Sequence, residues 1–192
     1  MALEGKIVRL REEREADLQF LIDLRNDMDT QGWSQRLPPD YTLDMYEKRH
    51  RERDFTMERK DGRFTIVDKE SGELIGTIGY AELEPRLSAT VGIAITKKYW
   101  GSGAAMDAIE TLLQFLYQGL GLQVVRLWTH SGNERAVGSA EKIGFKVALR
   151  QREGIFYDGR LYDNLVMDMT REEYFERHPD LEDGLPSMEI DR

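Results

Sequence analysis

Residues 97–117 read KKYWGSGAAMDAIETLLQFLY, and this stretch decides the fold. An apolar segment, LSATVGIAIT at 87–96, ends just before it, and Gly101 and Gly103 stand at the start of a helical pattern. The helix is amphipathic because its apolar and polar residues occupy separate faces, with Met106, Ile109, Leu113 and Leu116 on one and Asp107, Glu110, Gln114 and Gln118 on the other. Glycines between a strand and a helix leave N–H groups free at the positive end of the helix dipole, which predicts a site for a phosphate-bearing anion.

The glycine pair also admits a plainer interpretation, because a Gly-x-Gly at a helix start is often only a tight turn. The stretch is not a P-loop, since no Gly-Lys-Ser or Gly-Lys-Thr closes it. It is not a dinucleotide fingerprint either, since Met106 stands where a third glycine is needed. The rest of the chain therefore has to distinguish an anion site from an ordinary turn.

Composition limits the function classes. The chain has 192 residues, 40% of them hydrophobic, which favours one domain, here residues 1–175, followed by a polar tail at 176–192. A net charge of -9 disfavours nucleic acid and favours a cationic small molecule or a protein amine as partner, unless the acidity only maintains solubility. The sequence has no cysteine, no apolar run long enough for a membrane span and no signal peptide, so we expect a cytoplasmic protein. Three scattered histidines predict no metal site.

The first half of the chain alternates early helices with a group of strands. Residues 6–12 predict a strand, 14–28 a helix, and 43–53 a second helix capped by Thr42. Three strands follow at 62–68, 72–83 and 87–96, and the short turn-rich links between them predict an antiparallel meander.

In the second half, helix and strand alternate. Residues 122–130 predict an apolar strand, which should lie near the strand at 87–96 as the parallel partner of a right-handed crossover. A helix over 133–145 has Asn133 as cap, Lys142 in its last turn and Gly144 as left-handed stop. Two further strands meet at the tight turn of Asp158 and Gly159. We expect an α/β (α+β) fold: a mixed, mostly antiparallel twisted sheet with helices on both faces and one parallel strand pair.

Two motifs resemble a known family. The run from Lys98 to Gly103 resembles the (Gln/Arg)-x-x-Gly-x-(Gly/Ala) signature of the GNAT family, the acetyl-CoA-dependent N-acetyltransferases. The run NERA at 133–136, followed by EKIGF at 141–145, resembles the second family segment at its usual separation. The beginning and end of residues 5–175 also look like the branch of ribosomal-protein N-terminal acetyltransferases and spermidine acetyltransferases.

The resemblance implies the GNAT fold and an acetyl-CoA site between two splayed parallel strands. Backbone groups of Ile93 and Ile95 would pair with the pantetheine. The pyrophosphate would lie on the glycine turn, formed by Lys98, Gly101, Ser102, Gly103, Ala104 and Ala105, with Lys98 replacing the usual Gln or Arg. Asn133 and Lys142, which lie in the second family segment, would also bind the cofactor. These residues also have simpler interpretations. Ile93 and Ile95 can be core residues of a strand, Asn133 can be a helix cap only, and Lys142 can be a surface lysine.

Acetyl transfer to an amine requires a base, because an alkyl amine has a pKa near 10 and is protonated at neutral pH. A strand N–H near Ile93 would stabilise the oxyanion. The family's acidic tyrosine is replaced by Ala140, which leaves Ser139 as a neighbouring hydroxyl, and its strand glutamate is replaced by Thr90. Other residues that could act as base or acid are Glu82, with Glu84 as fallback, and His130. Histidine is a candidate because the unperturbed pKa of an imidazole is about 6.5. Each also has a simpler interpretation as a solvated surface residue.

Acceptor recognition in this family comes from the first two helices, their connection and the final hairpin. The resemblance therefore assigns aromatic walls and acidic partners for an amine to these segments: Trp33, Tyr41, Tyr157 and Tyr162, with Asp29, Asp40 or Asp163. Two functions remain: an acetyltransferase acting on a small amine or a protein N-terminus, and a non-catalytic acyl-CoA-binding or regulatory module. Many relatives dimerise, so the terminal hairpin is a candidate homodimer surface.

Overall fold

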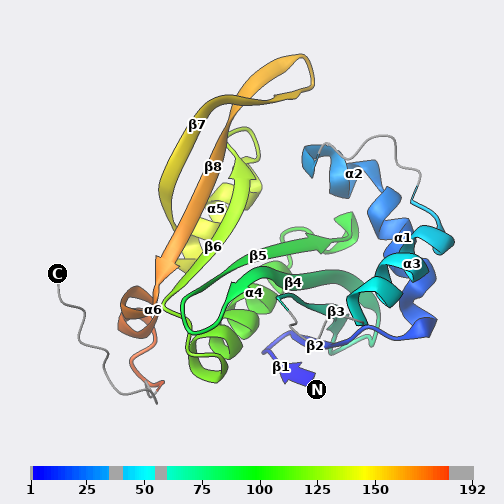
Figure 1. Cartoon of the computed structure of the whole chain (residues 1–192), viewed down its shortest axis with the longest axis horizontal. Coiled ribbons are helices and arrows are strands. Elements are labelled where there is room, and N and C mark those ends of the chain that lie inside the picture. Colours follow the sequence, from blue (N-terminus) through cyan, green and yellow to red (C-terminus); the bar gives the residue numbers. More distant parts are fainter. Residues whose placement is uncertain (1, 35–40, 55–59, 182–192) are drawn as a thin grey trace.

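The computed structural model describes residues 2–34, 41–54 and 60–181, with the side chains of residues 34 and 49–54 outside the description. Its strands form one sheet in the order β1-β2-β3-β4-β5-β6-β8-β7 (Figure 1). Their bounds are Ala2–Glu4 for β1, Val8–Glu12 for β2, Gly62–Asp68 for β3, Leu74–Glu84 for β4, Ser88–Ile95 for β5, Val124–His130 for β6, Lys146–Tyr157 for β7 and Arg160–Thr170 for β8. Neighbouring strands are antiparallel except β5 and β6, which are parallel.

Helices cover both faces of the sheet. They are α1 (Leu18–Asn26), α2 (Met28–Gln31), α3 (Leu43–Asp54), α4 (Ala104–Gln114), α5 (Glu134–Ile143) and α6 (Arg171–Arg177), and a π-helical turn over Phe115–Gly119 extends α4. Phe64 and Ile66 of β3 belong to the core that α4 covers, whereas Thr65 between them donates to Asp17 just before α1 (Oγ1 to Oδ2, 3.3 Å). Successive strand residues point to opposite faces, so α4 and α1 lie on opposite sides.

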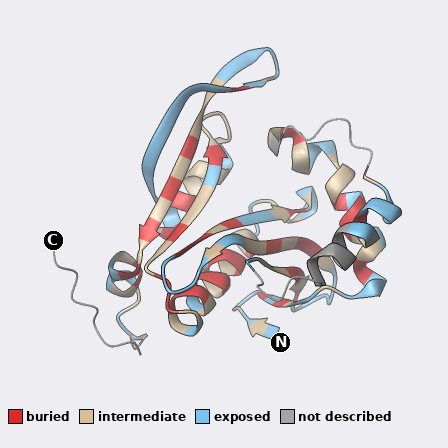
Figure 2. Cartoon of the chain, viewed as in Figure 1, coloured by how far each residue is buried: buried red, intermediate tan, exposed pale blue. Residues whose placement is uncertain are grey.

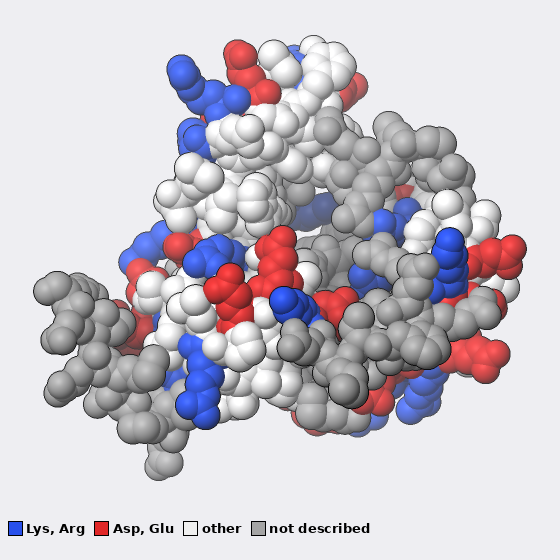
Figure 3. All heavy atoms as spheres, viewed as in Figure 1, with Lys and Arg blue, Asp and Glu red and all other residues white. Residues whose placement is uncertain are grey.

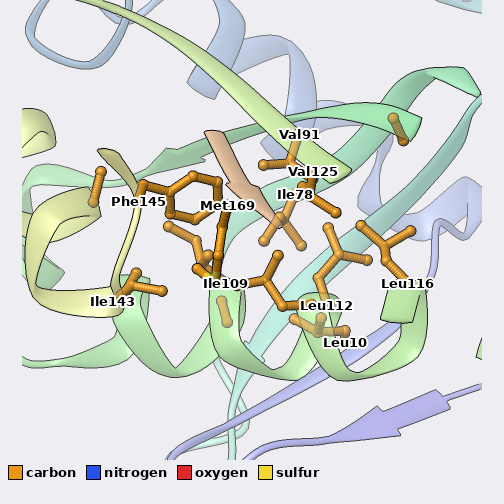
Figure 4. Close-up of a cluster of buried hydrophobic side chains, with 14 of the residues drawn as sticks. Leu10, Ile78, Val91, Ile109, Leu112, Leu116, Val125, Ile143, Phe145 and Met169 are labelled. Carbon is orange, nitrogen blue, oxygen red and sulfur yellow. The ribbon is translucent and has the colours of Figure 1, made fainter. Parts of the chain in front are cut away.

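The main hydrophobic core lies between the sheet and α4. Figure 4 shows α4 packing through one face against strand residues and against the end of α5, with Leu10, Ile78, Val91, Val125, Ile143, Phe145 and Met169 around Ile109, Leu112 and Leu116. A smaller cluster of Leu21, Ile22 and Tyr46 joins α1 to α3. Strands β3, β4 and β5 contain runs of buried residues, while β7 is exposed over most of its length (Figure 2).

One carboxylate connects the beginning of the chain to α4. Asp107, in the first turn of α4, accepts hydrogen bonds from the backbone N–H groups of Lys6 (2.9 Å), Ile7 (2.7 Å) and Val8 (2.9 Å). This contact holds the β1–β2 turn beside the glycines that precede α4.

The main elements expected from the sequence are confirmed. Strands β3, β4 and β5 form the antiparallel meander, and β5 pairs in parallel with β6, where Ser88 pairs with Val124. The hairpin turn between β7 and β8 has two left-handed residues, Asp158 (φ 46°) and Gly159 (φ 75°), and Gly144 ends α5 with φ 120°.

Some boundaries and two elements differ from expectation. The helix expected over 14–28 begins at Leu18, because a 3-10 turn over Glu15–Asp17 precedes it, and α1 ends at Asn26. Strand β1 and helix α6 were not expected. The sequence does contain a signal for α6, since the Thr170 hydroxyl and the Glu173 carboxylate form a reciprocal capping box.

The expected boundary between residues 175 and 176 remains a prediction. Helix α6 ends at Arg177, and Leu181 packs against the main core. The described helices are too short or too polar to cross a bilayer.

Candidate active site

The parallel strands β5 and β6 pair only over their first halves. Their last paired residues are Val91 and Leu127, yet β5 continues to Ile95 along β4 and β6 continues to His130 along β8. The two ribbons diverge beyond this point (Figure 1). We call residues 92–95 of β5 and 128–130 of β6 the fork.

One side of the fork presents unpaired peptide groups. Thr96 N–H donates to Ile75 O at 2.9 Å, and residues of an antiparallel ladder alternate between pairs that exchange hydrogen bonds and pairs that do not. In this register Ala94 bonds to β4, whereas Ile93 and Ile95 direct their N–H and C=O groups away from β4, toward the fork. The Ile95 carbonyl accepts a hydrogen bond from Trp100 Nε1, which leaves the N–H groups of both isoleucines and the carbonyl of Ile93 without a partner among the described residues. The backbone geometry therefore fits the pantetheine contact that the sequence predicted for these isoleucines.

The glycine turn lies where β5 leads into α4. Gly101 and Gly103 are both left-handed, with φ of 79° and 88°. A Cβ on Gly101 would meet nothing within 4 Å, and one on Gly103 would meet only Ile7 Cδ1 at 3.4 Å. Glycine is therefore required by conformation, and the space in front of the turn is open.

The turn offers backbone donors to an anion. Within the described residues, the N–H groups of Gly101, Gly103, Ala105 and Met106 have no acceptor, while Ala104 N–H donates to Ser102 Oγ at 3.2 Å. The Ser102 hydroxyl donates to Tyr99 O at 2.8 Å, so it shapes the turn. The four free N–H groups at the start of α4 fit the diphosphate of acetyl-CoA.

The lysines beside the turn are already paired. Lys98 Nζ lies 2.5 Å from Glu73 Oε2, and this hydrogen bond raises the pKa of Lys98 above its ordinary value. Lys97 Nζ lies 2.9 Å from Asp29 Oδ2. Lys98, which the resemblance assigned to the cofactor diphosphate, is therefore paired with a carboxylate of the protein.

An arginine that the sequence reasoning missed occupies the space beside the turn. The Arg135 guanidinium lies over the ring of Trp100, with Cζ 3.3 Å from the ring centroid. Trp100 itself is anchored by a hydrogen bond from Nε1 to Ile95 O at 2.9 Å. The available signal was a cation in the first turn of a helix, where the dipole disfavours it.

Asn133 and Lys142 lie at opposite ends of α5. The Asn133 side chain accepts from Ala136 N–H at 3.3 Å and so caps the helix, near the end that carries Arg135. Lys142 lies in the last turn, about 12 Å along the axis from Glu134 at 1.5 Å per residue.

A carboxylate meets the position where the family glutamate is missing. Glu82 Oε2 accepts a hydrogen bond of 2.7 Å from Thr90 Oγ1. Glu82 has φ 54°, and the pairing of β4 with β5 is irregular between Ala81 and Glu84. This bulge turns Glu82 toward Thr90 of β5, and Thr90 directly precedes Val91, where the fork begins. Glu84, by contrast, pairs with Ser88 at the beginning of β5.

The two positions considered for the acid lie on α5. Ala140, which replaces the family tyrosine, is 2% exposed and belongs to the main core. Ser139 next to it is half-buried.

Three of the four aromatic residues predicted for the acceptor come together, and His130 joins them. The ring of Trp33, in the 3-10 turn Gly32–Ser34, lies 4.0 Å from Tyr157, 5.2 Å from Tyr162 and 5.9 Å from His130, between centroids. A Cβ on Gly132 would lie 2.5 Å from both Trp33 and Tyr162, so this contact depends on that glycine. We call Trp33, Tyr157, Tyr162 and His130 the aromatic bridge.

The other acceptor candidates lie elsewhere or are occupied. Tyr41 packs against Tyr46, with centroids 6.0 Å apart, in the small cluster between α1 and α3. Asp29 is paired with Lys97, and Asp163 accepts from Arg150 at 2.8 Å, a hydrogen bond that holds the pKa of Asp163 below its ordinary value. Asp40 lies outside the described residues.

Known proteins resemble this chain in sequence and in fold. A sequence model described as Acetyltransferase (GNAT) domain matches residues 8–146. An SPbeta prophage-derived uncharacterized N-acetyltransferase of Bacillus subtilis (strain 168) is 31% identical over 124 residues, which are 64% of this chain and 69% of that protein. An uncharacterized N-acetyltransferase of Bacillus licheniformis is 27% identical over 127 residues, 63% of this chain and 68% of that protein.

Among solved structures, a spermidine N-acetyltransferase from Vibrio cholerae, in complex with CoA and spermine, superimposes with a TM-score of 0.79 at 25% identity, over 89% of this chain and 99% of that one. These relatives favour an enzyme over a non-catalytic module. The chain belongs to the GNAT family, and it is an N-acetyltransferase that transfers the acetyl group of acetyl-CoA to an amine.

Proposed function

We propose that this enzyme acetylates a small aliphatic amine and that Glu82 removes the proton from that amine. The hydrogen bond between Glu82 and Thr90 carries this proposal. Thr90 occupies the strand position at which the resemblance leads one to expect a glutamate, and Glu82 brings a carboxylate to the same place from the neighbouring strand. A left-handed non-glycine residue stores strain, which is typical of a functional position.

The chemistry requires few groups. The amine loses a proton to Glu82, directly or through one water, and its nitrogen attacks the thioester carbonyl carbon. The outward N–H of Ile93 is placed to donate to the oxyanion of the tetrahedral intermediate. Collapse of the intermediate breaks the C–S bond, the nitrogen releases its second proton as the amide forms, and the departing thiolate takes up that proton through water or through the Ser139 hydroxyl.

Charge and the aromatic bridge favour a small cationic acceptor. The net charge of -9 attracts cations, and the described acidic and basic side chains are interspersed on the face that Figure 3 shows. The Vibrio cholerae neighbour is a spermidine N-acetyltransferase with bound spermine, and the aromatic bridge supplies ring edges and faces against which an alkyl chain or an ammonium group can pack.

His130 can add a hydrogen-bond acceptor to the aromatic bridge. Asn164 Nδ2 donates to Gln151 Oε1 and to Gly154 O, both at 3.2 Å, which orients its Oδ1 toward His130 Nδ1 at 2.9 Å. Nδ1 therefore carries a hydrogen, and in the tautomer whose Nε2 has none, Nε2 can accept a hydrogen bond from a second amine of the substrate.

The expected cytoplasmic location and homodimer remain proposals. Phe156 and Leu161, paired across the β7–β8 hairpin, are 62% and 54% exposed, which supports the hairpin as the dimer surface.

The test is steady-state kinetics of Glu82→Gln with spermidine, an arylamine and a peptide with a free N-terminus. We expect kcat/KM for spermidine to fall by about 10²–10³, the usual contribution of a general base. The loss should be smaller for the arylamine, which is already neutral at pH 7. Thr90→Val should give a smaller loss in the same pattern.

Glu84→Gln tests the alternative base on the same strand. Equal losses for both amines in Glu82→Gln, or a larger loss in Glu84→Gln, would contradict the role of Glu82. Turnover of the peptide alone would reassign the acceptor to a protein N-terminus.

A further inference from the structure

We propose that Arg135, rather than Lys98, supplies the positive charge that binds the diphosphate of acetyl-CoA. The proposal depends on the cofactor of the family and not on the identity of the acceptor or of the base. Its failure would therefore leave the assignment of Glu82 untouched.

Arg135 is held beside the glycine turn by a chain of contacts. Its guanidinium lies on the Trp100 ring at 3.3 Å from the centroid, and Trp100 Nε1 donates to Ile95 O at 2.9 Å. Trp100 directly precedes Gly101 in the chain. The end of β5, the tryptophan and the arginine thus place a cation next to the free N–H groups of the turn.

The stacking leaves the hydrogen-bonding edge of the guanidinium available. A guanidinium is planar, and its five N–H donors lie in that plane. Contact with Trp100 uses one face, so the edge is free to donate to two oxygens of a phosphate. Within the described residues, Arg135 has no hydrogen bond and no ion pair with the protein.

This arrangement is electrostatically unfavourable without an anion. Arg135 is the second residue of α5, where the helix dipole repels a cation. Arg135 is exposed, yet partial desolvation of its guanidinium lowers its pKa below the ordinary value, and no carboxylate offsets that effect. The neighbouring Lys97 and Lys98, by contrast, are each neutralised by a carboxylate of the protein. A cofactor diphosphate would supply the missing negative charge.

The experiment measures the Kd of CoA by isothermal titration calorimetry for the wild type, Arg135→Gln, Arg135→Lys and Lys98→Gln. We expect Arg135→Gln to weaken binding about tenfold, the effect of one charge-assisted contact, and Arg135→Lys to fall between it and the wild type. Lys98→Gln should stay within about twofold, because it loses only an exposed ion pair. Lys48→Gln, at an exposed position of α3, removes the same charge from another element and should leave the Kd unchanged.

Dephospho-CoA identifies which phosphate is bound. If Arg135 binds the diphosphate, the substitution weakens CoA and dephospho-CoA by the same factor. A loss confined to CoA would place Arg135 at the 3′-phosphate and overturn the proposal.

The thermal stability of the ligand-free protein separates binding from packing. Because Arg135 opposes the dipole of α5 and lacks an anionic partner, ligand-free Arg135→Gln should melt at or above the temperature of the wild type. A lower melting temperature together with an unchanged Kd for CoA would make Arg135 a packing residue only. A large loss of CoA affinity in Lys98→Gln alone would restore the charge to Lys98.

Discussion

At the scale of single residues, Asp17 shows how a buried charge is stabilised in this fold. Its side chain accepts from Arg11 Nη1 and Nη2 at 2.6 and 2.9 Å, from Arg14 N–H at 2.9 Å and from Thr65 Oγ1 at 3.3 Å. Burial alone would raise the pKa of Asp17, but these hydrogen bonds outweigh it and hold the pKa below its ordinary value. The carboxylate thereby joins β2, the start of α1 and β3.

Stability should depend on the ionisation of Asp17. Its folded-state pKa is below the unfolded value of about 3.9, so the contribution is present at neutral pH and is lost as pH falls through the folded pKa. We expect Asp17→Asn to lower the free energy of unfolding by about 2–3 kcal/mol at pH 7, and the difference from the wild type to shrink below about pH 4. Urea denaturation followed by circular dichroism at pH 7, 4 and 3 measures both.

Asp23→Asn is the matched control, because Asp23 is an exposed carboxylate on α1 that contacts only Gln19 among the described residues. It should change stability little at any pH. A pH-independent deficit in Asp17→Asn would show that shape rather than charge makes Asp17 important.

At the scale of elements, the glycine turn joins β5 to α4 with two left-handed residues. Gly103 has a left-handed φ, so an added methyl would strain the backbone, and because the space there is open we expect the methyl to stand in front of the free N–H groups. Gly159, in the β7–β8 turn, is also left-handed, at φ 75°, and also has open space around it. The two glycines therefore differ in position but not in conformational requirement.

We expect Gly103→Ala and Gly159→Ala each to lower the free energy of unfolding by about 1 kcal/mol, the cost of a left-handed alanine. Only Gly103→Ala should weaken CoA, by about tenfold, because its methyl keeps the diphosphate from the amides. Thermal-shift titration with CoA measures both effects. An equal CoA affinity in the two variants would mean that the turn only starts the helix.

At the scale of the whole molecule, two parts of the sheet meet at the β5–β6 pair and separate at the fork. The aromatic bridge joins them again, because Trp33 comes from the segment after α2 whereas Tyr157 and Tyr162 come from the β7–β8 hairpin. This contact lies at the far end of β6, where His130 ends the strand. The bridge therefore connects the segment after α2 with the end of β6 and with the β7–β8 hairpin, among the residues predicted for the acceptor.

Removing Trp33 should affect the acceptor and spare the cofactor. We expect Trp33→Ala to raise the KM of the amine about tenfold, given the energy of aromatic and cation–π contacts, with the Kd of CoA unchanged. Tyr41→Ala, which removes an aromatic residue from the cluster between α1 and α3, should leave the KM unchanged. Parallel losses of CoA and amine affinity in Trp33→Ala would indicate a general disturbance of the fold.

Local patterns predicted most elements and part of the site. Periodicity identified the meander, α4 and β6, and turn chemistry identified the Asp158–Gly159 turn and the stop of α5 at Gly144. Helix α6 was not predicted, although Thr170 and Glu173 form a capping box at its start. The glycine turn was predicted because its conformational requirement is local.

The contacts of charged and aromatic side chains were less predictable. Lys98 was expected at the cofactor, but its partner Glu73 lies 25 residues earlier in the chain, across a strand connection. Arg135 and Trp100 are also far apart in sequence, and Glu82 reaches Thr90 only because a bulge shifts the register of β4. The residue pattern within one segment cannot predict contacts between residues that lie so far apart in the chain.

The sequence by itself determined the main elements, their order and the presence of a glycine turn before α4, because apolar period, caps and left-handed glycines act within a few residues. Tertiary structure alone decided which cation stands beside that turn, which carboxylate reaches the root of the fork and which aromatic residues meet. These choices depend on strand register, on a bulge and on how the segment after α2 meets the hairpin, all of which arise only when residues distant in the chain pack together.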